Sequence, residues 1–184
     1  EKINLKYKIR TDLAVSDEFD SLFVQIQNCN TRDIIVGVLY KPPNADVEEF
    51  NGKLEKILKI ITREHKPCYL LGDFNINLLK QGKHMPTKFF LDILLAQGFY
   101  PLINKPTRIT TESTTLIDNI FTNVHDLNTK SGIWITDISD HLPVFAIFPN
   151  KKSTKLNITR KYSKHIFNDE NKEKLKNGLN SCSS

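Results

Sequence analysis

The sequence predicts a mixed fold of strands and helices in which the strands dominate. Short apolar runs bounded by Gly, Pro, Asn or Asp recur along the chain, as is typical of strands. Two longer segments instead carry apolar residues at helical spacing, and there is no internal repeat. We therefore expect an α+β or α/β fold, arranged as a sandwich of sheets with helices on the outside.

The first part of the chain contains three predicted strands. Residues 3–10 and 21–27 change character with a period of two, which indicates extended backbone with two distinct faces. Residues 34–40 (IIVGVLY) are almost continuously apolar, so we expect a central strand that is covered on both faces. The polar connection 28–33 predicts that the second and third strands form an antiparallel pair.

Two amphipathic helices are expected to cover this sheet. The first spans residues 47 to about 64, and either Asn44 or Asp46 is expected to cap it. The second spans residues 88–97, with Thr87 as its N-cap. Both segments carry their apolar residues on one side, which is the side that packs against a sheet.

Four further strands are expected over residues 68–71, 116–121, 132–136 and 142–148. Asp118 lies in the middle of the second of them. A carboxylate between apolar strand residues costs several kcal/mol unless it has a partner. We therefore expect Asp118 to meet such a partner, which could be His141, an Asn or a metal ion.

The stretch Gly72-Asp73-Phe74-Asn75 is the first candidate for a functional site. Residues two apart on extended backbone face the same side, so Asp73 and Asn75 are expected to face one site while Phe74 enters the core. The carboxylate can orient or deprotonate a water, and the amide can donate to a phosphoryl oxygen. By themselves these residues also fit a simple turn.

Tyr40, Asp140 and His141 also stand at strand ends. Histidine changes charge near neutral pH, and a carboxylate on its second ring nitrogen fixes its tautomer. Asp118 is the better candidate for that task, because neighbours on a strand diverge and Asp140 is therefore expected to serve a divalent cation. A purely structural role stays open for each of the three.

Composition narrows the class of protein. The three cysteines are too few and too scattered for a disulfide framework or a zinc site, and the chain start lacks a signal peptide. We therefore expect an intracellular protein. No apolar run approaches the roughly 18 residues that a membrane helix needs, so no membrane partner is expected.

Positive charge is concentrated at the C-terminal end. Residues 151–184 contain nine Lys or Arg and three acidic residues, whereas the remainder contains 17 basic and 18 acidic residues. We expect one domain over residues 1–149 and a basic tail or linker over 150–184. Such a tail suits an anionic partner such as nucleic acid, or serves as a solvated linker.

Three motifs in this order resemble the endonuclease/exonuclease/phosphatase superfamily. They are Gly72-Asp73-Phe74-Asn75, Leu116-Ile117-Asp118-Asn119 and Ser139-Asp140-His141-Leu142-Pro143-Val144. Their order and spacing are similar to the apurinic-type endonuclease domain of non-LTR (LINE-type) retrotransposons. Two further stretches are similar to that group: Val38-Leu39-Tyr40-Lys41-Pro42-Pro43-Asn44, and Lys105-Pro106-Thr107-Arg108 with the segment from Thr114 to Asp118.

The resemblance implies a four-layer α/β sandwich, built of two packed mixed β-sheets with outer helices. It implies a nuclear endonuclease that nicks DNA with Mg²⁺, or Mn²⁺ in its place, by attack of water and without a small-molecule cofactor. The tail would lead to a reverse transcriptase. Carried over motif by motif, the site consists of Asp73 to activate the water, Asn75, His141 and Tyr40 to contact the phosphate, Asp118 to orient His141, and Asp140 near the metal.

One part of the family's pattern has no counterpart in this sequence. The family carries an Asn on its first strand and a metal-binding Glu at the end of an early strand, whereas Glu18 lies in a polar turn. We therefore expect a domain truncated at its N-terminus. Loss of a metal ligand weakens Mg²⁺ binding, so activity of this fragment is expected to be low or absent.

Two other functions stay open. One is a phosphatase or phospholipid phosphodiesterase of the same superfamily. The other is a degenerate fragment that binds nucleic acid through residues 151–176 without catalysis. The sequence leaves the oligomeric state and the DNA target undecided.

Overall fold

The computed structural model describes residues 6–14, 19–27 and 32–148. The chain divides into two units, Glu1–Ser153 and Thr154–Ser184. The predicted basic tail at 150–184 lies outside the described residues, and the boundary proposed for it stays a prediction.

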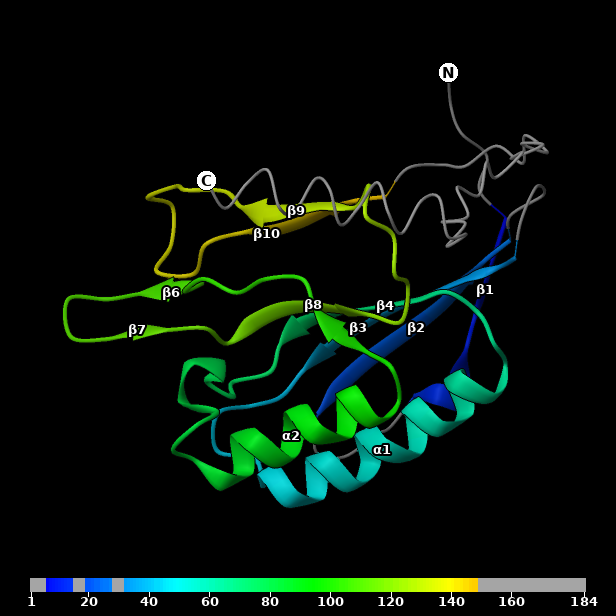
Figure 1. The fold of residues 1–184 in the computed structure, drawn as a ribbon, viewed down its shortest axis with the longest axis horizontal. Coiled ribbons are helices and arrows are strands. Elements are labelled where there is room, and N and C mark those ends of the chain that lie inside the picture. Colours follow the sequence, from blue (N-terminus) through cyan, green and yellow to red (C-terminus); the bar gives the residue numbers. More distant parts are fainter. Residues whose placement is uncertain (1–5, 15–18, 28–31, 149–184) are drawn as a thin grey trace, which may run out of the picture. The chain divides into compact units, whose positions relative to one another are not determined.

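A six-stranded mixed sheet forms the centre of the described fold, as Figure 1 shows. In spatial order its strands are β1 (Tyr7–Ile9), β2 (Asp20–Ile26), β3 (Ile34–Tyr40), β4 (Cys68–Asp73), β8 (Asp118–Thr122) and β5 (Tyr100–Pro101). β3 and β4 run parallel, and all other neighbours pair antiparallel. The predicted antiparallel pair of β2 and β3 is therefore confirmed. The parallel step needs a crossover, and a helix supplies it.

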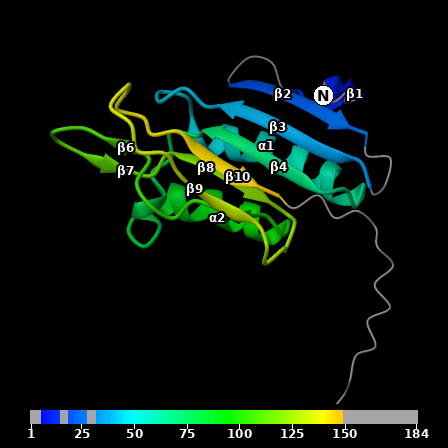
Figure 2. The same cartoon turned by 90° about the horizontal axis from the view of Figure 1, so that it is seen from above.

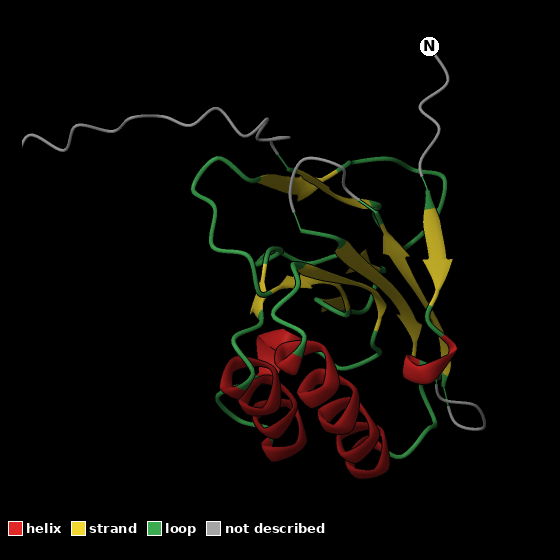
Figure 3. Cartoon of the chain, turned by 90° about the vertical axis from the view of Figure 1, so that its right-hand side faces the viewer, coloured by secondary structure: helices red, strands yellow, loops and turns green. Residues whose placement is uncertain are grey.

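That crossover is α1 (Val47–Arg63), which lies beside α2 (Met85–Ala96) on one face of the sheet, as Figure 3 shows. The Asp46 carboxylate accepts a hydrogen bond from the Glu49 backbone N–H at 2.8 Å, so Asp46 caps α1. The apolar stripe of α1 is buried against the sheet. None of the helices in the described ranges is long and apolar enough to cross a membrane.

A cluster of aromatic rings joins the helices to the sheet. Phe74 lies 5.5 Å from Phe90 of α2 and 5.2 Å from Phe121 of β8, measured between ring centroids. All three rings are at most 1% exposed. The prediction that Phe74 turns into the core is therefore confirmed, and this packing fixes the turn that follows β4.

A second, two-stranded sheet lies over the opposite face, as Figures 1 and 2 show. It pairs β9 (Lys130–Ile133) with β10 (Val144–Ile147) in antiparallel fashion. After β10, the Phe148 ring contacts the Tyr69 ring of β4, with the ring centroids 3.8 Å apart and the ring planes tilted by 37°. The expected class of packed mixed sheets with outer helices is confirmed, and the described residues supply three layers of the four.

The same sheet face is open over β2 and β3. Leu22 and Val38 are 52% and 50% exposed, and Tyr40 is 43% exposed. We expected β3 to be covered on both faces, and for the described residues this is wrong. β10 packs beside β8, so the two-stranded sheet covers the β4–β8 side and leaves this part of the face exposed.

Helix α2 begins earlier than predicted. Its N-cap is His84, whose Nδ1 lies 3.0 Å from the Thr87 hydroxyl, and Pro86 lies in the first turn. Proline favours that position because its missing N–H has no partner there in any case. Thr87, the predicted N-cap, is instead buried within the helix.

Three strand predictions also need correction. Asp118 is the first residue of β8 rather than its middle, so it lies at a sheet end where water is near. β9 ends at Ile133, and Trp134 follows it with 69% of its surface exposed. A hairpin of β6 (Arg108–Ile109) and β7 (Thr114–Thr115) occupies a segment that was expected to be a polar turn.

Candidate functional site

One end of the sheet carries a row of polar residues in register. Tyr40, the last residue of β3, pairs with Asp73, the last residue of β4. Asp73 in turn pairs with Asp118, the first residue of β8, and Asp20 of β2 pairs with Tyr40 on the other side. Residues paired in register point to the same face. The ends of four strands therefore place four polar side chains along one edge.

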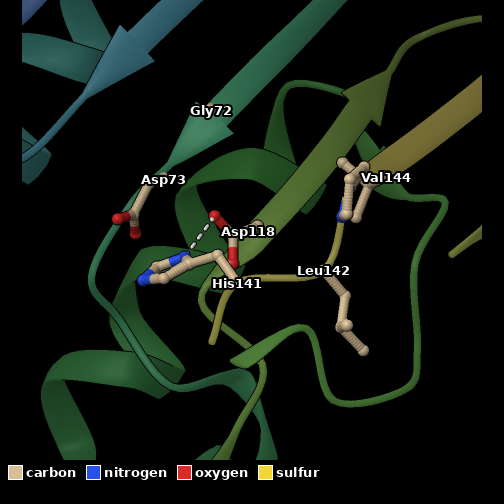
Figure 4. Close-up of a pocket in the computed structure, with 7 residues that line it drawn as sticks. Gly72, Asp73, Asp118, His141, Leu142 and Val144 are labelled. Carbon is tan, nitrogen blue, oxygen red and sulfur yellow. Dashed lines mark hydrogen bonds and ion pairs between the residues drawn. The ribbon is translucent and has the colours of Figure 1, made fainter. Parts of the chain in front are cut away.

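His141 meets this row from a segment far away in the sequence. Its Nδ1 lies 3.2 and 3.1 Å from the two carboxylate oxygens of Asp118, as Figure 4 shows. The Asp118 side chain is 16% exposed and that of His141 35%, so water screens this contact only in part. The predicted meeting of Asp118 and His141 is present. With the proton on Nδ1, the second ring nitrogen is left to face the site.

Asp73 is held by the turn that follows it. Its Oδ1 accepts a hydrogen bond from the Asn75 backbone N–H at 3.0 Å, and Asn75 has a φ of 49°. Burial raises the pKa of Asp73 above its ordinary value, and the nearby Asp118 carboxylate adds to this, while the Asn75 N–H opposes it. A carboxylate with a raised pKa is a stronger base than an ordinary one.

Gly72 lets β4 reach this position. A Cβ on Gly72 would lie 1.8 Å from the backbone oxygen of Leu39 on β3. No side chain fits at that distance, so the strand end needs glycine at this point. The residue therefore sets how closely β3 and β4 approach just before Tyr40 and Asp73.

Asn75 lies beside Asp73 in a different manner from the one we expected. Its backbone is left-handed rather than extended, and its amide donates to the Lys41 carbonyl at 2.9 Å and to Asp73 Oδ2 at 3.2 Å. The expected geometry of two side chains on one extended strand is thus wrong, because the strand ends at Asp73. In the described contacts, Asn75 orients Asp73. The expected contact of Asn75 with a phosphate stays a prediction.

Asp140 contacts Arg108 among the described residues. Its Oδ2 accepts a hydrogen bond from Arg108 Nε at 2.7 Å, and this bond holds the pKa of Asp140 below its ordinary value. The predicted metal-side role of Asp140 has no counterpart among the described contacts and stays a prediction.

Asp73, Asp118 and His141 form the group that could hold a cation. Each offers one ligand atom, and these atoms all lie within 4.8 Å of one another. They border a pocket of about 340 Å³, with Gly72 and Leu142 in its wall. Figure 4 shows the three side chains turned toward one another. Two carboxylates and an imidazole can bind a divalent cation, and can position a water and a phosphate.

Thr107 is a residue that sequence reasoning missed. It is fully buried, and its hydroxyl accepts hydrogen bonds from the backbone N–H of Ile117 at 3.2 Å and of Asp118 at 3.0 Å. Its carbonyl accepts from the Leu142 N–H at 2.7 Å. One residue thus ties the start of β8 to the segment that carries His141. The stretch 105–108 was noted for its family resemblance, but neither that resemblance nor a threonine in a polar turn indicates such a role.

Lys41 was missed as well. Its side chain is 1% exposed, its Nζ donates to the Pro42 carbonyl at 3.0 Å, and burial lowers its pKa. It follows Tyr40 directly, and its own carbonyl holds the Asn75 amide. Lys41 therefore supports the turn that carries Asp73.

Comparison with known proteins begins with a family model described as endonuclease-reverse transcriptase, which matches residues 34–145. That range is more than half of the 184 residues. It contains Tyr40, Asp73, Asp118 and His141. No curated protein matches the chain.

Several solved structures share the fold. The endonuclease domain of TRAS1, a telomere-specific non-LTR retrotransposon, matches with a TM-score of 0.63 and 17% identity, over 80% of this chain and 71% of that one. A family protein from Leptotrichia buccalis matches with a TM-score of 0.52 and 19% identity, over 70% and 54%. The 3′ phosphatase NExo from Neisseria, bound to product DNA hairpin, matches with a TM-score of 0.50 and 14% identity, over 79% of this chain and 70% of that one.

The range matched by the family model contains the strand ends that build the pocket. Of the similar structures, one is described as an endonuclease/exonuclease/phosphatase family protein and another as the endonuclease domain of a retrotransposon. The chain spans about half to seven tenths of the length of those structures. On the family match, this chain belongs to the endonuclease–reverse transcriptase family of the endonuclease/exonuclease/phosphatase superfamily.

Proposed function

We propose that this protein nicks DNA by metal-assisted hydrolysis of a phosphodiester bond, as the endonuclease domain of a retrotransposon-type protein. The observation that carries the proposal is the convergence of Asp73, Asp118 and His141 within 4.8 Å at one end of the sheet. The printed descriptions of two similar folds, a retrotransposon endonuclease and a phosphatase bound to a DNA hairpin, support DNA as the substrate. A nuclear location goes with that substrate.

Asp73 is proposed to orient and deprotonate the attacking water. Its raised pKa suits a general base, provided that the pH lies above that pKa. The described contacts keep its carboxylate in place, because the Asn75 backbone and amide both donate to it. Asn75 therefore acts on Asp73, and contact of its amide with the phosphate is a further part of the proposal.

His141 is proposed to stabilise the charge that develops on the phosphoryl oxygens. Asp118 binds its Nδ1, which leaves the other ring nitrogen to face the pocket and a bound phosphate. Tyr40 lies on the same face as Asp73 and is 43% exposed, so its hydroxyl can reach a bound phosphate.

The donor set fits a divalent cation with a preference for oxygen ligands. Asp73 and Asp118 would hold Mg²⁺, or Mn²⁺, from two adjacent strand ends. When bound, the cation supplies positive charge that offsets charge on the phosphate. The chain's own residues then position the water and the scissile bond.

Nicking of supercoiled plasmid with Mg²⁺ tests the proposal. We expect the 184-residue chain to convert supercoiled plasmid to open circles only slowly, because the family's metal-binding Glu has no counterpart in this sequence. Both Asp73→Ala and His141→Ala should abolish this residual nicking. Asp92→Asn is the matched control, because Asp92 is an exposed carboxylate of α2 on the other side of the sheet, and this variant should nick normally.

Three outcomes would contradict the proposal. Nicking by both site variants would show that Asp73 and His141 are not needed for the reaction. If the plasmid stays supercoiled with the wild-type chain at every Mg²⁺ and Mn²⁺ concentration, the chain does not have the proposed nicking activity. Hydrolysis of a phosphoinositide or of sphingomyelin without DNA nicking would move the chain to the phospholipid branch of the superfamily.

A further inference from the structure

Arg108 lies beside His141 through backbone pairing. The two residues form an antiparallel bridge. The Ile109 N–H donates to the Asp140 carbonyl at 3.0 Å, and the Leu142 N–H donates to the Thr107 carbonyl at 2.7 Å. The first strand of the β6–β7 hairpin is thus fixed against the segment that carries His141.

The side chain of Arg108 is held at one atom only. Its Nε donates to Asp140 Oδ2 at 2.7 Å, and within the described residues no bond is found from its two terminal nitrogens. The side chain as a whole is 42% exposed. An Arg held in this way presents two parallel N–H donors, which is the geometry that a phosphate accepts.

Stability gives a weak reason for this ion pair. The Asp140 side chain is 44% exposed, and exposed ion pairs contribute little to folding. The charge of the site gives a stronger reason. The carboxylates of Asp73 and Asp118 repel a polyanion, and the Arg108 cation acts on both of them. The pair with Asp140 has no net charge, but it fixes the cationic end near Asp73 and Asp118, which offsets part of that repulsion.

We propose that Arg108 binds a backbone phosphate of the DNA next to the pocket, and that Asp140 is a positioning residue that holds Arg108. The inference rests on the proposed function for its substrate, and it assigns Asp140 to the arginine in place of the metal. Neither the family match nor the descriptions of the similar structures give Arg108 a role.

Binding of a fluorescent DNA duplex, measured by anisotropy in EDTA, tests this without any turnover. We expect Arg108→Ala to weaken binding about tenfold, which is the loss expected for one or two charge-assisted hydrogen bonds. The slope of log K against log[salt] should fall by about 1, since one phosphate contact is lost. Arg108→Lys keeps the charge but loses the fork, and should recover only part of the affinity.

Asp140→Ala gives the sharper result, because the two roles predict opposite signs. If Asp140 positions Arg108, its loss weakens DNA binding although a negative charge is removed, and it has no weakening effect when Arg108→Ala is already present. If Asp140 is only an acid near the site, its loss tightens binding in both backgrounds. Asp137→Ala removes an exposed acid three residues earlier and should not weaken binding.

The cycle is independent of the nicking test. All four variants of the Arg108–Asp140 cycle carry the same tail, so its contribution to DNA binding cancels, and circular dichroism melts should coincide because the pair is exposed. Equal affinity and equal salt slope for wild type and Arg108→Ala would overturn the inference and leave the proposed nuclease standing. A chain that fails to nick but shows the predicted cycle would overturn the nuclease alone.

Discussion

The two ends of β4 use carboxylates in opposite ways. At its C-terminal end, Asp73 receives hydrogen bonds from the Asn75 backbone and amide and has no bonded cation among the described contacts. Before its N-terminal end, Glu64 receives hydrogen bonds from Arg10 at 3.1 and 2.5 Å and from Lys66 at 2.6 Å. Arg10 is 6% exposed, whereas the side chains of Glu64 and Lys66 are 25% and 26% exposed, so this network is a partly buried link between the strand edge and the end of α1.

The pKa values shift accordingly. Burial raises the pKa of Asp73, whereas the Arg10 hydrogen bonds lower the pKa of Glu64. At neutral pH the charge on Asp73 therefore costs stability and the charge on Glu64 contributes to it. An energetically costly carboxylate in a pocket is a candidate for catalysis, and a fully paired one is a candidate for a structural role.

The largest expected effect on stability comes from Gly72→Ala. The new Cβ would lie 1.8 Å from the Leu39 carbonyl oxygen, so β3 and β4 must separate. We expect a loss of at least about 3 kcal/mol in the free energy of unfolding. Gly52→Ala is the control, because its Cβ meets nothing within 4 Å on α1, and it should gain about 0.5–1 kcal/mol. Urea denaturation of both variants measures this, and an unchanged midpoint for Gly72→Ala would refute the close approach.

At the opposite end, Arg10→Met should cost about 2 kcal/mol. It removes the hydrogen bonds that Glu64, Asp12 and Gln25 accept from the guanidinium. Among the described contacts, Glu64 then keeps only Lys66 as a bonded cation. The Glu64 side chain is 25% exposed, so water limits the loss. Arg63→Met, on the exposed last residue of α1, should stay within about 0.5 kcal/mol of wild type. Equal melting of the two variants would show that the Arg10 network contributes nothing.

Thr107→Val should cost about 2 kcal/mol and also impair nicking. It leaves the backbone N–H groups of Ile117 and Asp118 without their acceptor in a buried position. Thr107→Ser keeps the hydroxyl and should lose far less stability and far less nicking activity than Thr107→Val. The ¹⁵N shift of the Asp118 amide reports the lost bond directly, and an unmoved signal in Thr107→Val would contradict this role.

The pH dependence of stability is the smallest expected effect. It should have opposite signs for Asp73 and Glu64, the carboxylates at the two ends of β4. The lowered pKa of Glu64 means that its contribution is present above its unfolded-state pKa and is lost as the pH falls through the folded-state pKa. The raised pKa of Asp73 means the reverse, with a contribution that is lost as the pH rises through the folded-state pKa. Unfolding between pH 3 and 7 should therefore show that Glu64→Gln and Asp73→Asn change the slope in opposite senses. The same sense for both would refute the comparison.

Local patterns predicted the parts of the fold that depend on local chemistry. The apolar run 34–40 forms β3 with the expected bounds, although one of its faces is exposed. The amphipathic segment from 47 onward is α1 with Asp46 as its cap. The two-residue strands of the β6–β7 hairpin could not be found in this way. They are held by pairing with each other and with His141, and that pairing exists only in the folded chain.

In the candidate site, too, local motifs predicted some features, and contacts between distant segments determine the others. Asp73, Asp118 and His141 were proposed from their motifs, and the fold brings them together. The left-handed backbone of Asn75 and the link from Arg108 to Asp140 were not expected, because each depends on which segment lies opposite. Their roles in turnover and in metal binding stay predictions until variants are measured.

One paired measurement tests the central claim most directly, namely that the two ends of β4 serve catalysis and stability separately. Nicking at 25 °C and thermal melting are compared for Asp73→Asn and Glu64→Gln. We expect Asp73→Asn to lose nicking and to melt no lower than wild type, and Glu64→Gln to nick normally and to melt lower. Nicking by Asp73→Asn, or loss of nicking in folded Glu64→Gln, would contradict the account.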